Sequence, residues 1–320
     1  MILFIKCKWR TERVIDMVEI KLDVPKKFYE EEIRCNYKIS KKMKEIWSVQ
    51  LDMLVELQRV CKKYGLSYFA DSGTLIGAVR HKGYIPWDDD IDIVMMREDY
   101  EKLLDVAEQE FKYPLFLQTT YSDDGYIRGH AQLRNSETTG AIRDDIGRGF
   151  NLGIFIDIFP MDILPDNKIQ QKMHIKYIDI LWRILFIGVE YNNNPNCSIY
   201  GKIVDRICKG IIKKIGYRTF FAYYEKVCSR YKNTNYQTIS YIAYSRGKNK
   251  HLWKKQWFNA SQQIPFEFIE IAIPIGYDER LRKEYGDYME IHQVPTSHGE
   301  IVMDANISYK NFFENSIKSK

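Results

Sequence analysis

The stretch PWDDDIDIVMM, residues 86–96, places four aspartates directly before and inside an apolar run. Side chains in a β-strand alternate between its two faces, so Asp90 and Asp92 share one face. Ile91 and Ile93 then occupy the opposite face and predict a strand that packs on a hydrophobic core. Carboxylates held this close repel each other unless a cation lies between them, so the fold around this strand must supply a partner for the charge.

The natural partners of clustered carboxylate oxygens are hard divalent cations such as Mg²⁺ or Mn²⁺. A solvated acidic loop that ends a strand is the alternative, and the Asp-x-Asp pattern alone does not separate the two. Asp157 lies in a second apolar run, GIFIDIFPMD, where an aspartate is costly unless it is paired or bound to a metal. An ion pair with a buried arginine is the alternative for Asp157. We predict Asp90, Asp92 and Asp157 as metal ligands and catalytic carboxylates, with Asp88 and Asp89 as supporting candidates.

A glycine-containing turn, Ser72-Gly73-Thr74, precedes the aspartates. It stands between a predicted strand at residues 67–70 and a short predicted helix at residues 74–80. A turn in this position offers backbone N–H groups and a helix N-terminus to a phosphate. Turns of this kind are common, so the turn is a candidate phosphate site only in combination with the carboxylates.

Three basic residues, Arg80, His81 and Lys82, connect the turn to the aspartates. They would add positive charge near a departing phosphate group, although a solvated basic turn is an equally simple interpretation. The order of a phosphate turn, an Asp-x-Asp strand and a later strand-borne carboxylate is typical of the nucleotidyltransferase fold. In that arrangement carboxylates hold divalent metals against the phosphates of a nucleotide.

The organisation of the chain predicts a mixed α+β fold with a nucleotidyltransferase-like core sheet and flanking helices. A helix is expected from Ser40, which can cap it, to Gly65, which can end it. Strands, among them one at 153–159, alternate with helices as far as residue 165. After that the chain becomes helical and rich in aromatic residues, with helices expected at 169–189 and 220–231 and an Asn-rich turn at 192–194 between them. We predict four regions: an N-terminal, loosely attached arm (1–39), the catalytic core (40–165), a helical subdomain (166–263) and a C-terminal strand-helix unit packed on the core (264–320).

The composition of the chain limits its expected partners and its expected location in the cell. The chain of 320 residues is 45% hydrophobic, enough for a sizeable core, and its net charge of +5 fits a nucleotide phosphate or a lipid surface as partner. No nucleic-acid partner is expected. The six cysteines include no C-x-x-C pair, which argues against structural zinc. With no visible cleavable signal peptide and no apolar run of membrane-spanning length, we expect a cytoplasmic protein.

Three segments together carry a resemblance to a known family. YFADSGTLIGAVRHKGYIPWDDDIDIVMMREDYEKL, residues 68–103, closely resembles the signature of the LicD family. Bacterial members of that family are phosphorylcholine transferases, and its animal relatives include fukutin and fukutin-related protein. GIFIDIFPMD and IPIGYDERLRKEYGDYM, residues 153–162 and 273–289, resemble two later blocks of the family. The match is dense over most of residues 40–165 and returns at 264–289.

The resemblance implies an activity. Its members share a nucleotidyltransferase-like core and a CDP-activated alcohol donor such as CDP-choline, CDP-ribitol or CDP-glycerol. They transfer the phospho-alcohol to a sugar hydroxyl of a cell-surface glycan, such as teichoic acid, capsule polysaccharide or lipopolysaccharide, and release CMP. A lipid-linked acceptor would bring the protein to the inner face of the cell membrane as a peripheral protein.

Positions can be carried over from the family one by one. The resemblance implies Asp90 and Asp92 as metal ligands and Asp157 as the third ligand. We expect Asp157, or a metal-bound alkoxide oriented by it, to activate the acceptor hydroxyl. Gly73 and Thr74 correspond to the phosphate-contacting turn.

Other positions are less completely matched. Arg80 corresponds to a basic residue of the same block, and Asp88 and Asp89 are candidates to join the metal site. After Met289 the chain carries one proline where many relatives carry a pair, so no roles are assigned there. The zinc-bearing insertion of some animal relatives has no counterpart, because a cysteine cluster is lacking.

Rival interpretations remain open. A nucleotidyltransferase would use the same carboxylates but release pyrophosphate. An Asp-x-Asp glycosyltransferase would use a nucleotide-sugar, usually with a nucleotide-binding βαβ unit ahead of the aspartates. A non-catalytic binding module would have to keep three costly carboxylates without a metal. The alcohol is also open: choline favours an aromatic cage, which 23 Tyr, 16 Phe and 6 Trp could build, whereas a polyol needs hydrogen-bonding groups.

Overall fold

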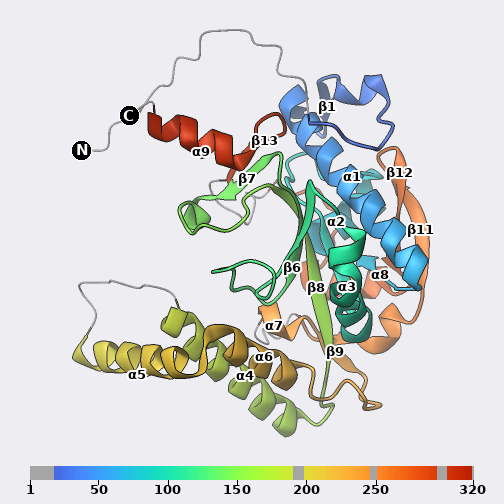
Figure 1. Ribbon diagram of the computed structural model, residues 1–320. Coiled ribbons are helices and arrows are strands. Elements are labelled where there is room, and N and C mark those ends of the chain that lie inside the picture. The colour runs from blue at the N-terminus through green and yellow to red at the C-terminus, as the bar shows by residue number, and fades with distance from the viewer. Residues whose placement is uncertain (1–17, 190–197, 246–250, 294–300, 319–320) are drawn as a thin grey trace.

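The computed structural model describes residues 18–189, 198–245, 251–293 and 301–318. A mixed sheet lies at its centre, α1 and α3 cover one face of the sheet, and α4, α5 and α6 form a separate helical layer (Figure 1). The α+β class expected from the sequence is confirmed. The helices are α1 Lys41–Tyr64, α2 Ser72–Ile76, α3 Arg97–Glu110, α4 Lys168–Val189, α5 Ile199–Ile215, α6 Tyr217–Cys228, α7 Ile242–Ser245, α8 Tyr277–Tyr285 and α9 Tyr309–Lys318.

The described residues form a seven-stranded sheet and three two-stranded ones. The large sheet runs in the order β5-β6-β8-β4-β3, and β9 and β10 continue it from the far half of β8. Its strands are β3 Phe69–Ala70, β4 Asp92–Met96, β5 Leu115–Gln118, β6 Ala131–Asn135, β8 Ile154–Leu164, β9 Thr238–Ser240 and β10 Trp253–Lys254. The two-stranded sheets pair β1 Glu32–Arg34 with β2 Tyr37–Ile39, β7 Thr139–Ile142 with β13 Ile301–Asp304, and β11 Ser261–Phe266 with β12 Ile269–Pro274.

Strand β8 is the hub of the large sheet, and all eleven of its residues are buried. One edge pairs in parallel with β4. The other edge pairs antiparallel with β6 along its first half and with β9 along its second half. A strand buried on both faces has a nearly continuous apolar sequence, and this apolar run is what identifies β8. The strand expected at 153–159 ends before β8 does.

Local signals set the ends of α1 as expected. The Ser40 side chain accepts a hydrogen bond from the Met43 N–H at 3.2 Å, and Gly65 closes the helix with a left-handed φ of 64°. The buried side of α1 packs on the sheet together with Ile91 and Ile93, whose side chains are fully buried. The predicted anchoring of the acidic strand in the core is therefore confirmed.

The segment ahead of α1 differs from the expected loosely attached arm. Leu22 packs against the core, and the backbone N–H groups of Lys21 and Leu22 donate to Asp52 Oδ1 at 3.0 and 2.8 Å. These contacts are non-local, so the periodicity of the segment gives no sign of them. Residues 1–17 of the predicted arm lie outside the described residues.

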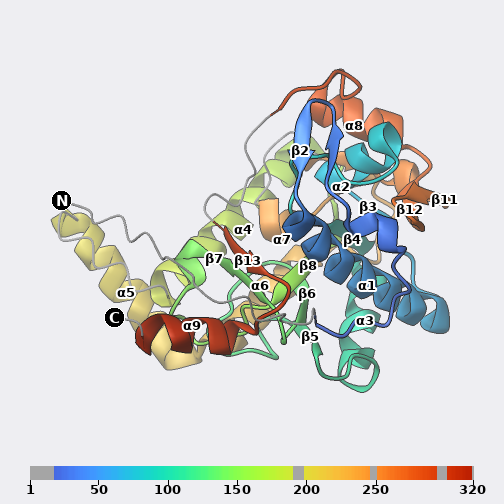
Figure 2. The ribbon, with the colours of Figure 1, turned by 90° about the horizontal axis from the view of Figure 1, so that it is seen from above.

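The helical layer contains more helix than expected. The sequence predicts helices corresponding to α4 and α6, and the structure adds α5 between them. The turn expected at Asn192–Asn194 lies outside the described residues. At the other end of the chain, β12 contacts β3 and α8 contacts α2, so the closing family block lies beside the turn that precedes the aspartates. Figure 2 shows this side of the molecule from above.

Candidate active site

Three of the predicted carboxylates meet in space. One oxygen each from Asp90, Asp92 and Asp157 lies within 4.8 Å of the others. The parallel pairing of β4 with β8 sets Asp92 directly opposite Asp157, which accounts for their proximity. Asp90 comes two residues earlier on the same face of the chain. The cluster is mostly withdrawn from solvent, with Asp90 and Asp157 buried and Asp92 half-buried.

Burial and neighbouring carboxylates act together on the charge of Asp92. Burial raises the pKa of Asp92 well above its usual range, and the charges of Asp90, Asp157 and Asp88 raise that pKa further. Oxygen atoms at this separation, in a buried and electron-rich cluster, match the donor set that Mg²⁺ or Mn²⁺ prefers. The residues present therefore fit a divalent cation.

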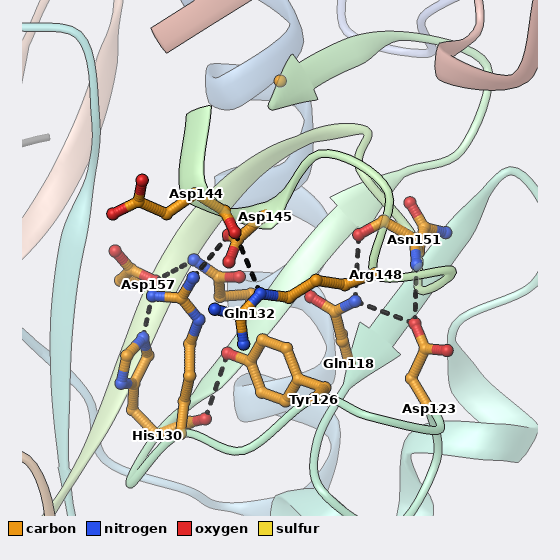
Figure 3. A network of polar contacts seen from close by, with 12 residues as sticks. Gln118, Asp123, Tyr126, His130, Gln132, Asp144, Asp145, Arg148, Asn151 and Asp157 are labelled. Atoms are coloured by element: carbon orange, nitrogen blue, oxygen red, sulfur yellow. Dashed lines mark hydrogen bonds and ion pairs between the residues drawn. The ribbon is translucent and has the colours of Figure 1, made fainter. Parts of the chain in front are cut away.

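Two donors hold Asp157: Gln132 on β6, and His130 directly before that strand. Gln132 Nε2 donates to Asp157 Oδ1 at 2.7 Å, and His130 Nε2 lies 3.2 Å from the same oxygen (Figure 3). Burial lowers the pKa of His130, so its ring is neutral at physiological pH. Because a carboxylate only accepts hydrogen bonds, the ring proton must be on Nε2.

A buried arginine decides which way the Gln132 amide points. Arg134 Nη2 donates to Gln132 Oε1 at 2.5 Å, and its Nε donates to Gln118 Oε1 at 2.5 Å. A guanidinium has donors only, so Gln132 must turn its oxygen toward Arg134 and its NH₂ toward Asp157. Burial lowers the pKa of Arg134 to about 10, which still leaves it charged at neutral pH. Hydrogen bonds from Arg134 to Gln132 and from Gln132 to Asp157 therefore orient the Asp157 carboxylate.

Side chains of α1 donate hydrogen bonds to the backbone of the acidic loop, residues 88–90, that precedes β4. Trp47 Nε1 donates to the carbonyl of Asp88 at 3.1 Å, and Gln50 Nε2 donates to the carbonyl of Asp89 at 2.8 Å. With these backbone groups fixed, oxygens from Asp88, Asp89 and Asp90 also lie within 4.8 Å of one another. The structure thus places the two supporting candidates next to the main cluster through Asp90.

The predicted phosphate turn lies against the same loop. Thr74 Oγ1 accepts a hydrogen bond from the Asp92 N–H at 2.8 Å, which ties the turn to the first residue of β4. Ser72 adopts a positive φ of 47° at the start of α2. A Cβ added to Gly73 would come within 2.5 Å of Asp88 Oδ2. Ser72, Gly73 and Thr74 are therefore brought to the carboxylates, and their role toward phosphate stays a prediction.

The close approach of Gly73 gives a testable consequence. Gly73→Ala is expected to displace the Asp88 carboxylate and to weaken the apparent Mg²⁺ affinity about tenfold. Because the end of a flexible side chain can move aside, the melting temperature should change little. Gly210→Ala is the control, since a Cβ there meets nothing within 4 Å. A Mg²⁺ titration of activity makes the measurement, and equal Mg²⁺ affinity in the two variants would contradict the prediction.

The side chains of the basic candidates Arg80 and Lys82 bind backbone carbonyls. Arg80 Nη1 donates to the carbonyls of Tyr288 and Glu290 at 2.6 and 2.9 Å, so Arg80 links the first family block to the third. Lys82 Nζ donates to the carbonyl of Val79 at 3.2 Å. Both side chains are engaged with backbone oxygens, and their expected contribution near a leaving group stays a prediction.

Comparison with known proteins relates this site to a family. A profile described as LicD/FKTN/FKRP, nucleotidyltransferase domain, matches residues 65–192. The lipopolysaccharide cholinephosphotransferase LicD of Haemophilus influenzae is 30% identical over 251 residues, which make up 78% of this chain and 92% of that protein. The chain belongs to the LicD family. It is accordingly an enzyme, a LicD-like phosphotransferase.

This chain is also similar, over shorter segments, to two uncharacterized proteins. One, from Rickettsia prowazekii, is 42% identical over 57 residues, 18% of this chain and 21% of that protein. The other, from Rickettsia typhi, is 46% identical over 63 residues, 20% of this chain and 19% of that protein. They add nothing on function.

Several residues of this LicD-family site were not predicted. His130 stands directly before β6, and Gln132 and Arg134 lie on it. Their i, i+2, i+4 spacing in the sequence is a signal for one polar strand face. Arg280, which is fully buried, donates to Asp71 Oδ2 at 2.7 Å. The sequence positions of that pair carry no comparable signal, because the contact joins residues 209 apart.

Proposed function

We propose that this enzyme moves a phospho-alcohol from a CDP-activated donor to a sugar hydroxyl of a cell-surface glycan and releases CMP. The group would be phosphocholine, or ribitol or glycerol phosphate. The observation that carries the proposal is the buried cluster of Asp90, Asp92 and Asp157 beside the Ser72-Gly73-Thr74 turn. The Haemophilus influenzae relative is by name a lipopolysaccharide cholinephosphotransferase, which favours phosphocholine as the group and a glycan as the acceptor.

A divalent cation, Mg²⁺ or Mn²⁺, would be held by Asp90, Asp92 and Asp157, with Asp88 close enough to assist. Bound there, it would offset negative charge on the phosphate oxygens of the donor. The protein's own part is to hold these carboxylates in place and to orient them through Gln132.

In the proposed reaction, the acceptor hydroxyl oxygen forms a bond to the phosphorus that carries the alcohol. The bond from that phosphorus to the bridging oxygen of the pyrophosphate breaks, and CMP leaves with the electron pair. Asp157 takes up the hydroxyl proton, and the hydrogen bond from Gln132 keeps its carboxylate oriented toward the acceptor side. The Ser72-Gly73-Thr74 turn would contact the donor phosphates.

Product analysis tests this function. The protein is incubated with CDP-choline, CDP-ribitol or CDP-glycerol, Mg²⁺ and a glycan acceptor, and CMP is quantified by chromatography. We expect acceptor-dependent CMP release that excess chelator abolishes. Release of pyrophosphate from a nucleoside triphosphate would identify a nucleotidyltransferase, and turnover in excess chelator would contradict the metal requirement.

We also propose a lipid-linked acceptor and peripheral contact with the inner face of the cell membrane. None of the described helices combines the length and the apolar character that a membrane crossing needs. On α5, Tyr200, Ile203 and Ile207 are 76%, 51% and 56% exposed and form one stripe along the helix. Lys202 and Arg206 are exposed beside that stripe. An apolar stripe flanked by basic residues suits the surface of an anionic bilayer.

The position of α5 suits such contact, because it lies at the outer edge of the molecule in both views (Figures 1 and 2). Ile207→Asp is expected to weaken co-sedimentation with phosphatidylglycerol-containing vesicles about tenfold, since it removes one buried apolar side chain from the interface. Ile33→Asp changes an isoleucine that is 73% exposed on β1 and should have no effect. Equal vesicle binding by both variants would contradict membrane contact through α5.

A further inference from the structure

A groove of about 740 Å³ is lined by residues of α3, α4 and α6 and of the turn that follows α6. Arg97, the first residue of α3, forms part of its wall and directly follows β4, whose other end carries Asp92. Five residues of strand span roughly 16 Å, so the groove lies well away from Asp92. No described residue lines both this groove and the cavity beside the carboxylates to which His130 contributes. The groove is therefore a separate candidate site.

The acidic groups in the wall of the groove are already paired. Glu225 accepts hydrogen bonds from Tyr121 Oη at 2.6 Å and from Arg97 Nη1 at 3.2 Å. Glu101 forms an ion pair with Lys232 Nζ at 2.8 Å. Each carboxylate thus has a donor of the protein beside it, so the described part of the wall presents no unpaired negative charge to a ligand.

Two positive charges at the groove are unpaired. Lys226 on α6 and Arg230 in the turn after α6 are exposed, and neither side chain has a hydrogen-bond or ion-pair partner among the described residues. The charge of Arg230 acts on Tyr177 and His174, which belong to α4. Burial, and then the charge of Arg230, lower the pKa of His174 to about 4, so His174 is neutral at pH 7. The unpaired charge of Arg230 therefore lies close to α4 as well as to α6.

A pair of tyrosines adds a hydrogen-bond donor. The hydroxyls of Tyr177 on α4 and Tyr223 on α6 are 2.7 Å apart in the wall of the groove. One hydroxyl donates to the other, so the proton of the second has no acceptor among the described residues. Because α4 and α6 pack side by side in the helical layer (Figure 1), this donor and the two unpaired cations surround one space.

A phosphate monoester matches this arrangement of donors. It carries a charge of about −1.5 to −2 at pH 7, and its three terminal oxygens accept hydrogen bonds from several directions. The groove is much larger than a phosphate group and within the range of small-molecule sites, so it leaves room for the organic part of the ligand. We propose that the groove binds a phosphate monoester through Arg230, Lys226 and the Tyr177–Tyr223 hydroxyl pair. This site is additional to the proposed reaction and does not depend on it.

Calorimetric titration with glucose 6-phosphate tests the site, in chelator and without a CDP donor, so that no metal contributes. Arg230→Gln and Lys226→Gln should each weaken binding about tenfold, because each removes a charge-assisted hydrogen bond. Both side chains are exposed and unpaired, so thermal melts should show that the variants stay folded. Lys62→Gln is the matched control, since it removes the same charge from an exposed position on α1 and should leave the affinity unchanged.

Two further titrations separate the phosphate group from the rest of the ligand. Glucose, which lacks the phosphate, should not bind, and inorganic phosphate should bind several-fold more weakly than glucose 6-phosphate. Equal affinity for inorganic phosphate would overturn the monoester in favour of the free ion. Affinities of Arg230→Gln and Lys226→Gln equal to that of the wild-type protein would place the phosphate elsewhere, and no binding of glucose 6-phosphate to the wild-type protein would likewise overturn the proposal.

Discussion

Asp92→Asn is expected to reduce phospho-alcohol transfer by about 10³-fold or more, because it removes charge from the centre of the carboxylate cluster. The same substitution should raise the melting temperature of the metal-free protein at neutral pH. Burial and neighbouring carboxylates raise the pKa of Asp92 in the folded state, so ionising Asp92 opposes folding. Loss of activity and gain of stability in one variant would be the signature of a site built for a cation.

The sign of the pH dependence follows from that raised pKa. The contribution of Asp92 to stability is fully present below the ordinary pKa of a carboxyl group and is lost as pH rises through its folded-state pKa. The stabilisation of Asp92→Asn over wild type in chelator should therefore grow as the pH rises above about 4, the ordinary pKa of the carboxyl group. Thermal melts at a series of increasing pH values make the measurement.

Two comparisons complete the test of Asp92. Mg²⁺ should raise the melting temperature of the wild-type protein more than that of Asp92→Asn, because only the intact cluster binds it well. Asp179→Asn, in a surface pair with Arg183 on α4, should change neither activity nor the pH trend. Activity of Asp92→Asn within tenfold of wild type would rule out an essential role for this carboxylate.

Asp162→Ala is expected to destabilise the fold by about 3 kcal/mol or more, because it leaves a buried guanidinium without its main partner. Asp162 is fully buried in β8 and accepts two hydrogen bonds from Arg97, from Nε and Nη2, both at 2.8 Å. Arg97 is 4% exposed and is the first residue of α3, directly after β4. This pair links the far ends of the two strands that carry Asp92 and Asp157.

Urea unfolding measures the effect of Asp162→Ala. Asp179→Ala removes an exposed i,i+4 pair in which Arg183 Nε donates to Asp179 Oδ2 at the same distance, 2.8 Å, and should cost no more than about 0.5 kcal/mol. The double variant Arg97→Met/Asp162→Leu should recover much of the lost stability, since an apolar replacement leaves no charge unpaired. Equal midpoints for Asp162→Ala and Asp179→Ala would show that the buried pair does not stabilise the fold.

Features that depend on neighbours in the chain were predictable from the sequence. Ser40 and Gly65 act within one helical turn, so the limits of α1 are readable from local pattern. The alternation from Asp90 to Ile93 separates a core face from a carboxylate face without any knowledge of the rest of the fold. The same local pattern missed α5 and the packed segment before α1, which depend on contacts made after folding.

The sequence by itself determined that Asp90 and Asp92 share a strand face and that Asp157 is an isolated carboxylate in a buried strand. Only the tertiary structure decided that Asp157 lies opposite Asp92 and that Gln132 and His130 hold it. The physical reason is that strand alternation is a local property, whereas strand order and register are set by burying both faces of the sheet at once. The chemistry of the site therefore depends on a pairing between β4, β6 and β8 that no single segment encodes.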